Sequence, residues 1–69
     1  MISYKPLFRL LLEKDMKKTQ LKKEIGISSA VLAKMGKNEH VSMATIENIC
    51  AYFHCRIEDV IEFIDDIEH

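Results

Sequence analysis

The sequence predicts an all-α domain built from five short helices, with no strand. The chain has 69 residues with only one proline and two glycines, so few positions interrupt a helix. Apolar residues make up 48% of the chain, which is enough for one compact core. They recur three and four positions apart, which is the spacing of one helix face. A chain of this length forms a single domain, predicted to span residues 1–69.

The first predicted helix runs from about Tyr4 to Lys14. Ser3 precedes it as the expected N-cap, and Pro6 falls in the first turn, where a proline costs no hydrogen bond. The apolar stripe has the three- to four-residue spacing of a buried helix face. Its expected members are Leu7, Leu11 and either Phe8 or Leu10.

The second and third predicted helices are separated by a very short connection. The second covers about Lys18–Ile25, and the third begins after its N-cap Ser28 and reaches Met35 or Gly36. A connection of only three residues, beginning at Gly26, forces the two helices to cross at a steep angle, as in a helix-turn-helix unit. Gly26 supplies the positive φ that this corner needs. The residues expected between the two helices are Leu21, Ile25, Ile27, Leu32 and Met35.

Two further helices are predicted after a loop over residues 36–41. The fourth is capped by Ser42 and spans about Met43–Phe53, and the fifth covers about Ile57–Asp65 after a break at residues 54–56. Both show the apolar repeat of a helix that faces a core. The repeating residues are Ile46, Ile49, Cys50 and Phe53 in the fourth helix and Ile57, Val60, Ile61 and Ile64 in the fifth.

Charge is divided unevenly along the chain. The formal net charge is −1, yet residues 1–38 hold nine Lys or Arg and three acids (9 − 3 = +6). Residues 39–69 hold one Arg and eight acids (1 − 8 = −7). A domain divided in this way has one face that attracts polyanions and another that repels them. The simpler alternative is a pair of solvated charged faces without a partner.

The stretch from Leu21 to Met35 resembles a known family. It reads Leu-Lys-Lys-Glu-Ile-Gly-Ile-Ser over residues 21–28, followed by Leu32 and Met35, and the similarity continues downstream over 41–50 and 55–61. These segments resemble the Cro/repressor-type helix-turn-helix family, also called lambda-repressor-like or the xenobiotic-response-element family, over residues 3–64. The resemblance implies a compact five-helix DNA-binding domain with the helix-turn-helix at helices 2–3. It also implies a transcriptional regulator whose third helix, about 28–36, reads the major groove.

The same resemblance implies which residues contact DNA. Near the start of the third helix, Ser29 and Lys34 can hydrogen-bond to a base, and an alanine can meet a thymine methyl group. Basic residues at the start of the second helix and just after the third are expected to clamp phosphates. The alternatives are a solvated lysine face and an idle serine hydroxyl. The expected interface residues are Lys17, Lys18, Thr19, Ser28, Ser29, Ala30, Ala33, Lys34, Lys37 and Asn38.

The sequence departs from the family pattern at two positions. Lys17 stands at the cap of the second helix, where many members have Ser or Thr, and Lys22 takes a position usually held by a small residue beside the helix crossing. The third helix also lacks Arg, Asn and Gln, the side chains best suited to bidentate base reading. Backbone charge and DNA shape are therefore expected to contribute more than direct base contacts.

Double-stranded DNA is the expected partner, and the family commonly binds it as a dimer with recognition helices about 34 Å apart. A homodimer is expected to use the fifth helix and the tail, where Phe63, Ile64 and Ile67 could form an apolar patch. The same residues could instead close the core of a monomer. The alternative function is a protein-interaction module that binds another regulator or a toxin through the acidic second half.

The composition argues against several other classes of protein. No apolar run is long enough for a membrane span or a signal peptide, so a cytoplasmic protein is expected. Cys50 and Cys55 are predicted to be free thiols, and together with His40 and His54 they match no zinc-site spacing. Neither a catalytic constellation nor a ligand domain is recognisable. The sequence therefore predicts no enzyme, metal, cofactor or small-molecule effector.

Overall fold

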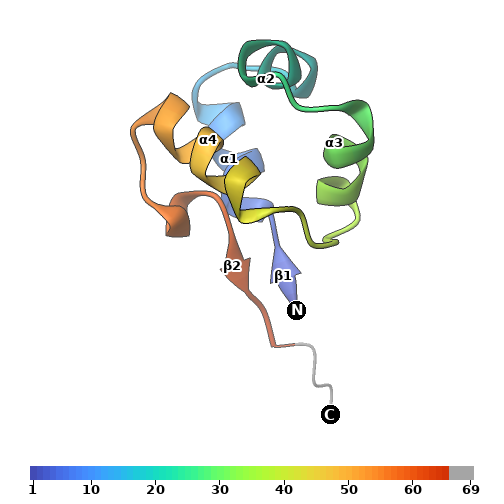
Figure 1. Cartoon of the computed structure of the whole chain (residues 1–69). Helices are drawn as coiled ribbons and strands as arrows, with labels where there is room; N and C mark the ends of the chain where they lie inside the picture. Colours follow the sequence, from blue (N-terminus) through green and yellow to red (C-terminus); the bar gives the residue numbers. More distant parts are fainter. Residues whose placement is uncertain (66–69) are drawn as a thin grey trace.

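Four helices and a two-stranded sheet make up the fold in a computed structural model that describes residues 1–65. The helices surround one core, and the two strands pair below it (Figure 1). Within the described residues, none of the helices is long and apolar enough to span a bilayer. The elements in chain order are β1 (Ile2–Ser3), α1 (Lys5–Glu13), α2 (Lys18–Ile25), α3 (Ser29–Gly36), α4 (Met43–Phe53), the 3-10 turn η1 (Ile57–Asp59) and β2 (Glu62–Phe63).

The boundaries of α2, α3 and α4 confirm the predicted ones because the expected capping groups are in place. Ser28 Oγ accepts a hydrogen bond of 3.1 Å from the Val31 N–H. Ser42 Oγ accepts one of 3.2 Å from the Thr45 N–H. Each serine thus satisfies a backbone donor that the first turn of its helix leaves without a partner. Gly26 ends α2 in the left-handed conformation, with φ of 74°.

The start of α1 differs by one residue from the prediction. Tyr4, not Ser3, occupies the cap position, and Ser3 Oγ accepts a hydrogen bond of 3.2 Å from the Lys5 N–H. The Leu7 N–H, which has no partner within the helix, donates to the Val60 carbonyl at 3.2 Å. A backbone donor in the first turn of α1 is therefore satisfied by a residue near the other end of the chain.

The predicted fifth helix is wrong. The chain forms only the short turn η1 and then runs out as β2, antiparallel to β1, with Ile2 opposite Phe63. The strand pairing gives backbone partners to residues that precede α1, as in the 2.9 Å bond from the Ile64 N–H to the Met1 carbonyl. The segment is also rich in Val, Ile and Phe, which favour strands over helices. The five-helix prediction is thus corrected to four helices with a small sheet.

Eight apolar side chains are buried in one core to which every helix contributes. Seven were expected from the periodicity, but Tyr4 was not. Ile57 and Ile64, predicted to face the core from a fifth helix, are 43% and 38% exposed because that helix does not form. The buried residues are Tyr4, Leu7, Leu11, Leu21, Met35, Ile46, Ile49 and Val60.

Tyr4 links the start of α1 to the loop that follows α3. Its hydroxyl donates a 2.7 Å hydrogen bond to the Glu39 carbonyl, and its N–H donates to Asn38 Oδ1 at 3.4 Å. Burial raises the pKa of the Tyr4 hydroxyl, and a hydrogen bond with the Val41 backbone acts weakly in the opposite direction. These bonds hold the carboxyl end of α3 against the body of the domain.

Candidate nucleic-acid interface

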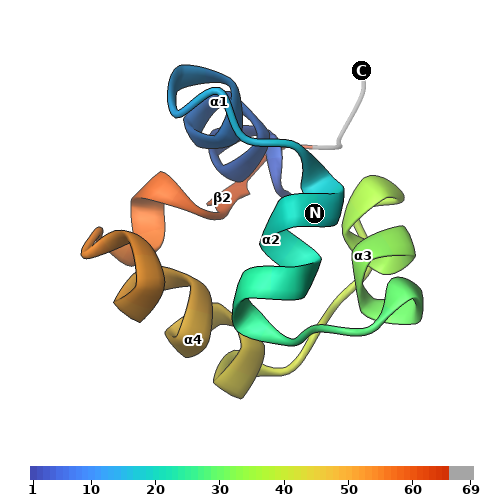
Figure 2. The ribbon, with the colours of Figure 1, turned by 90° about the horizontal axis from the view of Figure 1, so that it is seen from above.

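Helices α2 and α3 cross at the Gly26 corner and share the core through the buried side chains of Leu21 and Met35. Ile25 and Leu32 are partly buried and pack against the same core, as expected for a helix-turn-helix unit. Ile27, in the turn, is half-buried. Packing on one side leaves the other side of α3 at the surface of the molecule (Figure 2). A duplex could therefore reach α3 without any rearrangement.

The outer face of α3 is polar or small. Ser29, Ala30, Ala33 and Lys34 are all exposed, and they follow the helical spacing of a single face. Two alanines in this row leave the backbone of α3 accessible to the edge of a base pair. The four residues expected to read bases from this helix are therefore brought together by the fold.

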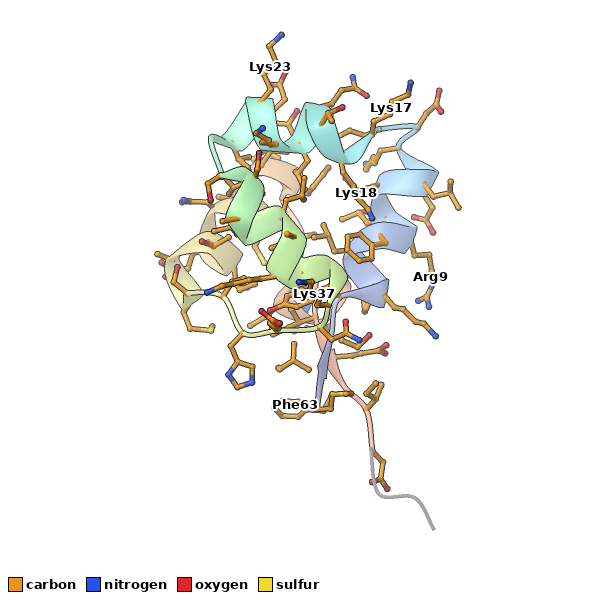
Figure 3. All side chains as sticks on the ribbon, turned by 90° about the vertical axis from the view of Figure 1, so that its right-hand side faces the viewer. Arg9, Lys17, Lys18, Lys23, Lys37 and Phe63 are labelled. Carbon is orange, nitrogen blue, oxygen red and sulfur yellow. The ribbon has the colours of Figure 1, made fainter. Side chains whose placement is uncertain are left out.

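The amino end of α2 places three exposed polar residues beside this face: Lys17, Lys18 and Thr19. The Lys17 N–H donates to Gln20 Oε1 at 2.9 Å. The Gln20 side chain thus satisfies a backbone donor at the start of α2, where the N-cap residue is a lysine in place of Ser or Thr. The Lys18 ammonium lies 4.4 Å from the centre of the Phe8 ring (Figure 3). This cation–π contact holds the charge against α1, at the start of α2.

The carboxyl end of α3 carries the second expected clamp. Lys37 is exposed and directly follows the last residue of α3, and in Figure 3 it lies on the same face of the molecule as Lys18. Asn38 is half-buried in the left-handed conformation, and its Oδ1 accepts the hydrogen bond from Tyr4. Only the amide NH₂ of Asn38 remains available to a phosphate, and its carbonyl oxygen is used to hold the loop.

Comparison with known proteins identifies the family. A family model for the Cro/C1-type HTH DNA-binding domain matches residues 7–66, which include α2, α3, α4 and all but the first two residues of α1. The chain belongs to the Cro/C1-type family of DNA-binding domains. Among solved structures, a crystal structure of the transcriptional regulator VanUg is similar, with a TM-score of 0.90 and 42% sequence identity over 94% of this chain and 87% of that one. No curated protein sequence matches significantly.

One contact in the Cro/C1-type domain was not predicted. Lys22, which is half-buried in the last turn of α2, donates from Nζ to Ser29 Oγ over 2.7 Å. The two residues are seven positions apart on different helices, so their pairing depends on the crossing angle and not on any sequence pattern. The only signal was a lysine at a position usually held by a small residue.

Acidic residues of the Cro/C1-type domain gather away from α3. A hollow between α1 and η1 is lined partly by Glu13, Glu58, Asp59 and Glu62, with Arg9 beside them. In Figures 1 and 2, η1 and α3 lie on opposite sides of the molecule. Much of the acidic charge of the second half therefore lies on the side of the molecule opposite α3, although Glu39 lies just after that helix.

The cysteines do not add a second site. Cys50 and Cys55 are free and half-buried near the end of α4. Burial, followed by the neighbouring Cys50, raises the pKa of the Cys55 thiol, which makes it a weaker nucleophile at neutral pH. No group of three or more His, Cys, Asp or Glu side chains within residues 1–65 could hold a metal ion.

Proposed function

We propose that this Cro/C1-type domain regulates transcription by inserting α3 into the major groove of double-stranded DNA. The observation that carries the proposal is the outer face of α3, which is exposed and carries only serine, alanine and lysine, with further exposed lysines at the start of α2 and just after α3. A helix of this kind fits the dimensions of the major groove, and the cations match the phosphates on its two sides.

The proposed base contacts come from Ser29, Ala30, Ala33 and Lys34. The Lys34 ammonium can donate to guanine O6 or N7, and either alanine can pack on a thymine methyl group. Lys34 is the one side chain among them that can contact two acceptors of a base, so we expect modest discrimination per base pair. Sequence preference would then also depend on the shape and deformability of the DNA.

The proposed phosphate contacts are made at both ends of the helix-turn-helix. Lys17, Lys18 and Thr19 would bind one strand from the start of α2. Lys37 and the Asn38 amide would bind the other from the end of α3. Ser28 Oγ caps α3, but its hydroxyl hydrogen can still be donated to a phosphate oxygen.

A homodimer remains part of the proposal, but its surface changes. Because η1 and β2 replace the fifth helix, pairing would use the outer side of β2, where Phe63 is 83% exposed. Met1 and Ile64 are exposed nearby, at 57% and 38%, and Ile67 lies outside the described residues. An apolar group of this kind is typical of an interface. Sedimentation of Phe63→Ser on DNA tests it: the variant should bind as a monomer where the parent binds as a dimer.

Binding at several salt concentrations tests the main proposal. A site is first selected from random duplex DNA. If Lys17, Lys18 and Lys37 each neutralise one phosphate, the slope of log Kobs against log salt is about −2.7 per protomer. Lys37→Ala should weaken binding and make the slope shallower by about 0.9. Lys23→Ala is the matched control, because Lys23 extends away from α3 in Figure 3. A salt-independent affinity, or equal losses in both variants, would contradict the proposal.

The acidic hollow between α1 and η1 supports a second candidate, in which this side binds a basic surface of another protein. The two functions respond to different substitutions. Glu58→Lys or Glu62→Lys should abolish such a complex and leave DNA binding intact, and Lys34→Ala should do the reverse. Pull-down of a partner that survives both glutamate reversals would exclude this surface.

A further inference from the structure

The contact between Lys22 and Ser29 has a direction that chemistry fixes. An ammonium group carries three N–H donors and no lone pair, so Lys22 Nζ must be the donor in the 2.7 Å bond to Ser29 Oγ. The serine oxygen is therefore the acceptor, and its own hydrogen must point elsewhere. Within residues 1–65, the Ser29 hydroxyl has no acceptor of its own, and the residue is exposed at the first position of α3.

The consequence is that Ser29 presents a donor to whatever approaches α3. A lone serine hydroxyl can rotate and either donate or accept. Once it accepts a hydrogen bond from an ammonium, one lone pair is occupied and its O–H is polarised, which makes it a stronger donor. The Lys22 ammonium keeps two further N–H donors beside it. Together they offer three donors against one remaining serine lone pair, so the pair favours an acceptor over a donor.

The interaction of the Lys22 charge with the helix dipoles adds little net stability at this position. In the last turn of α2 its positive charge is favourable, but its ammonium reaches the first turn of α3, where a positive charge is unfavourable. The two effects oppose each other. Lys23, the next residue, carries the same charge in the same turn of α2 but extends away from the molecule (Figure 3). Substituting Lys23 therefore measures the general effect of a positive charge in this turn, and substituting Lys22 measures in addition the effect of the hydrogen bond to Ser29.

We propose that Lys22 and Ser29 act as one DNA-contacting unit, in which Lys22 holds the Ser29 hydroxyl as an outward donor to an acceptor on DNA. This inference rests on the proposed function and adds Lys22 to the interface. The acceptor is either a phosphate oxygen or the O6/N7 edge of guanine, since both present lone pairs to a donor at the start of a groove-docked helix.

A double-mutant cycle on the full-length chain tests the coupling. Lys22→Met keeps most of the packed stem and removes the ammonium, and Ser29→Ala removes the hydroxyl without changing the backbone. Affinity for a selected duplex is measured for the parent, both single variants and the double variant. We expect each single change to weaken binding about fivefold, and the double change to weaken it little further, which is a coupling of about fivefold. The matched cycle with Lys23→Met and Ser29→Ala should be additive.

Binding to single-base variants of the selected site distinguishes the two acceptors. If the acceptor is guanine, Ser29→Ala flattens discrimination at one position. If it is a phosphate, the same change weakens binding by one factor on every sequence. Melting temperatures from circular dichroism check folding, and Lys22→Ala replaces Lys22→Met if the latter is unstable.

Three outcomes decide the matter. If the substitutions at Lys22 and Ser29 are coupled in their effect on DNA affinity, and those at Lys23 and Ser29 are additive, the proposed DNA-contacting unit is supported. Additive effects in both cycles, while Lys34→Ala still weakens binding, overturn this inference and leave the proposed function standing. If the parent shows no salt-dependent DNA binding, the proposed function fails and the unit falls with it.

Discussion

Replacing Gly26 by alanine is the sharpest test of the turn between α2 and α3. Gly26 has φ of 74°, and an added Cβ would meet no other atom within 4 Å. Any loss of stability must therefore come from the backbone conformation and not from a clash. The substitution measures how strongly the helix crossing depends on a left-handed residue.

The expected magnitude follows from two opposing effects. An L-residue with a Cβ loses roughly 1–2 kcal/mol in the left-handed conformation. Alanine also lowers the conformational entropy of the unfolded chain, which stabilises the folded state by about 0.4–1 kcal/mol. Gly26→Ala should therefore lower the free energy of unfolding by about 1 kcal/mol, which is a fall of about 4–8 °C in Tm for a domain of this size. Gly26→Asn should lose less, because asparagine tolerates this conformation better.

Gly36 provides a matched control in the same unit. It ends α3, has no positive φ, and an added Cβ would also meet nothing within 4 Å. Gly36→Ala should therefore raise the free energy of unfolding, by about 0.5–1 kcal/mol, because alanine favours helix. Urea denaturation followed by circular dichroism gives both values. If Gly26→Ala proved as stable as the parent, the left-handed turn would not be what sets the crossing of α2 and α3.

The remaining predictions concern other strained or buried groups. Tyr4→Phe should lower the free energy of unfolding by about 1–2 kcal/mol, because the Glu39 carbonyl loses its hydrogen bond. Since burial raises the pKa of Tyr4, the parent protein should keep this stabilisation below pH 10 and lose stability as the pH rises further. The Tyr4→Phe variant should lose less stability over the same pH range. In urea titrations, the control variant Tyr52→Phe, in which an exposed tyrosine is changed, should behave like the parent. Iodoacetamide should alkylate Cys55 at pH 8 more slowly in the folded than in the urea-unfolded protein, and equal rates would contradict the raised thiol pKa. His54→Gly should raise Tm, because His54 ends α4 with φ of 54°; an unchanged Tm would mean that histidine fits there without strain.

Local signals in the sequence predicted most of the fold. Ser28 and Ser42 fix where α3 and α4 begin, because each cap bond joins residues only three positions apart. Gly26 ends α2 for a reason that is equally local. Such features need no knowledge of distant contacts, so a single sequence is enough to find them.

The carboxyl segment could not be predicted in the same way. The apolar residues from Ile57 to Ile64 have helical spacing, yet residues 62–63 pair with residues 2–3 at the opposite end of the chain. The Val60 carbonyl also accepts from Leu7 in α1. Partners this distant in sequence leave no periodic signal, and they override a local preference when both ends of the chain need backbone hydrogen bonds.

The candidate interface shows the same division. Residue types and the family resemblance predict which lysines lie beside α3, and their exposure agrees with that expectation. The roles of Asn38 and Lys22 depend instead on contacts between separate elements, since Asn38 binds Tyr4 and Lys22 binds Ser29. A side chain's hydrogen-bond partner across a helix crossing is set by geometry, which the sequence does not state.

The spatial division of charge resolves an apparent conflict between a net charge of −1 and a DNA-binding role. The described chain is at least 20 Å across in every direction. Surface charges are screened over about 8 Å at physiological salt, so a phosphate near α3 senses the lysines there far more than the acids beside η1. A duplex that meets the η1 side is repelled, and one that meets the α3 side is attracted. If the domain binds DNA through α3 as proposed, we expect the acidic half to orient it before contact and so to raise the rate of productive association.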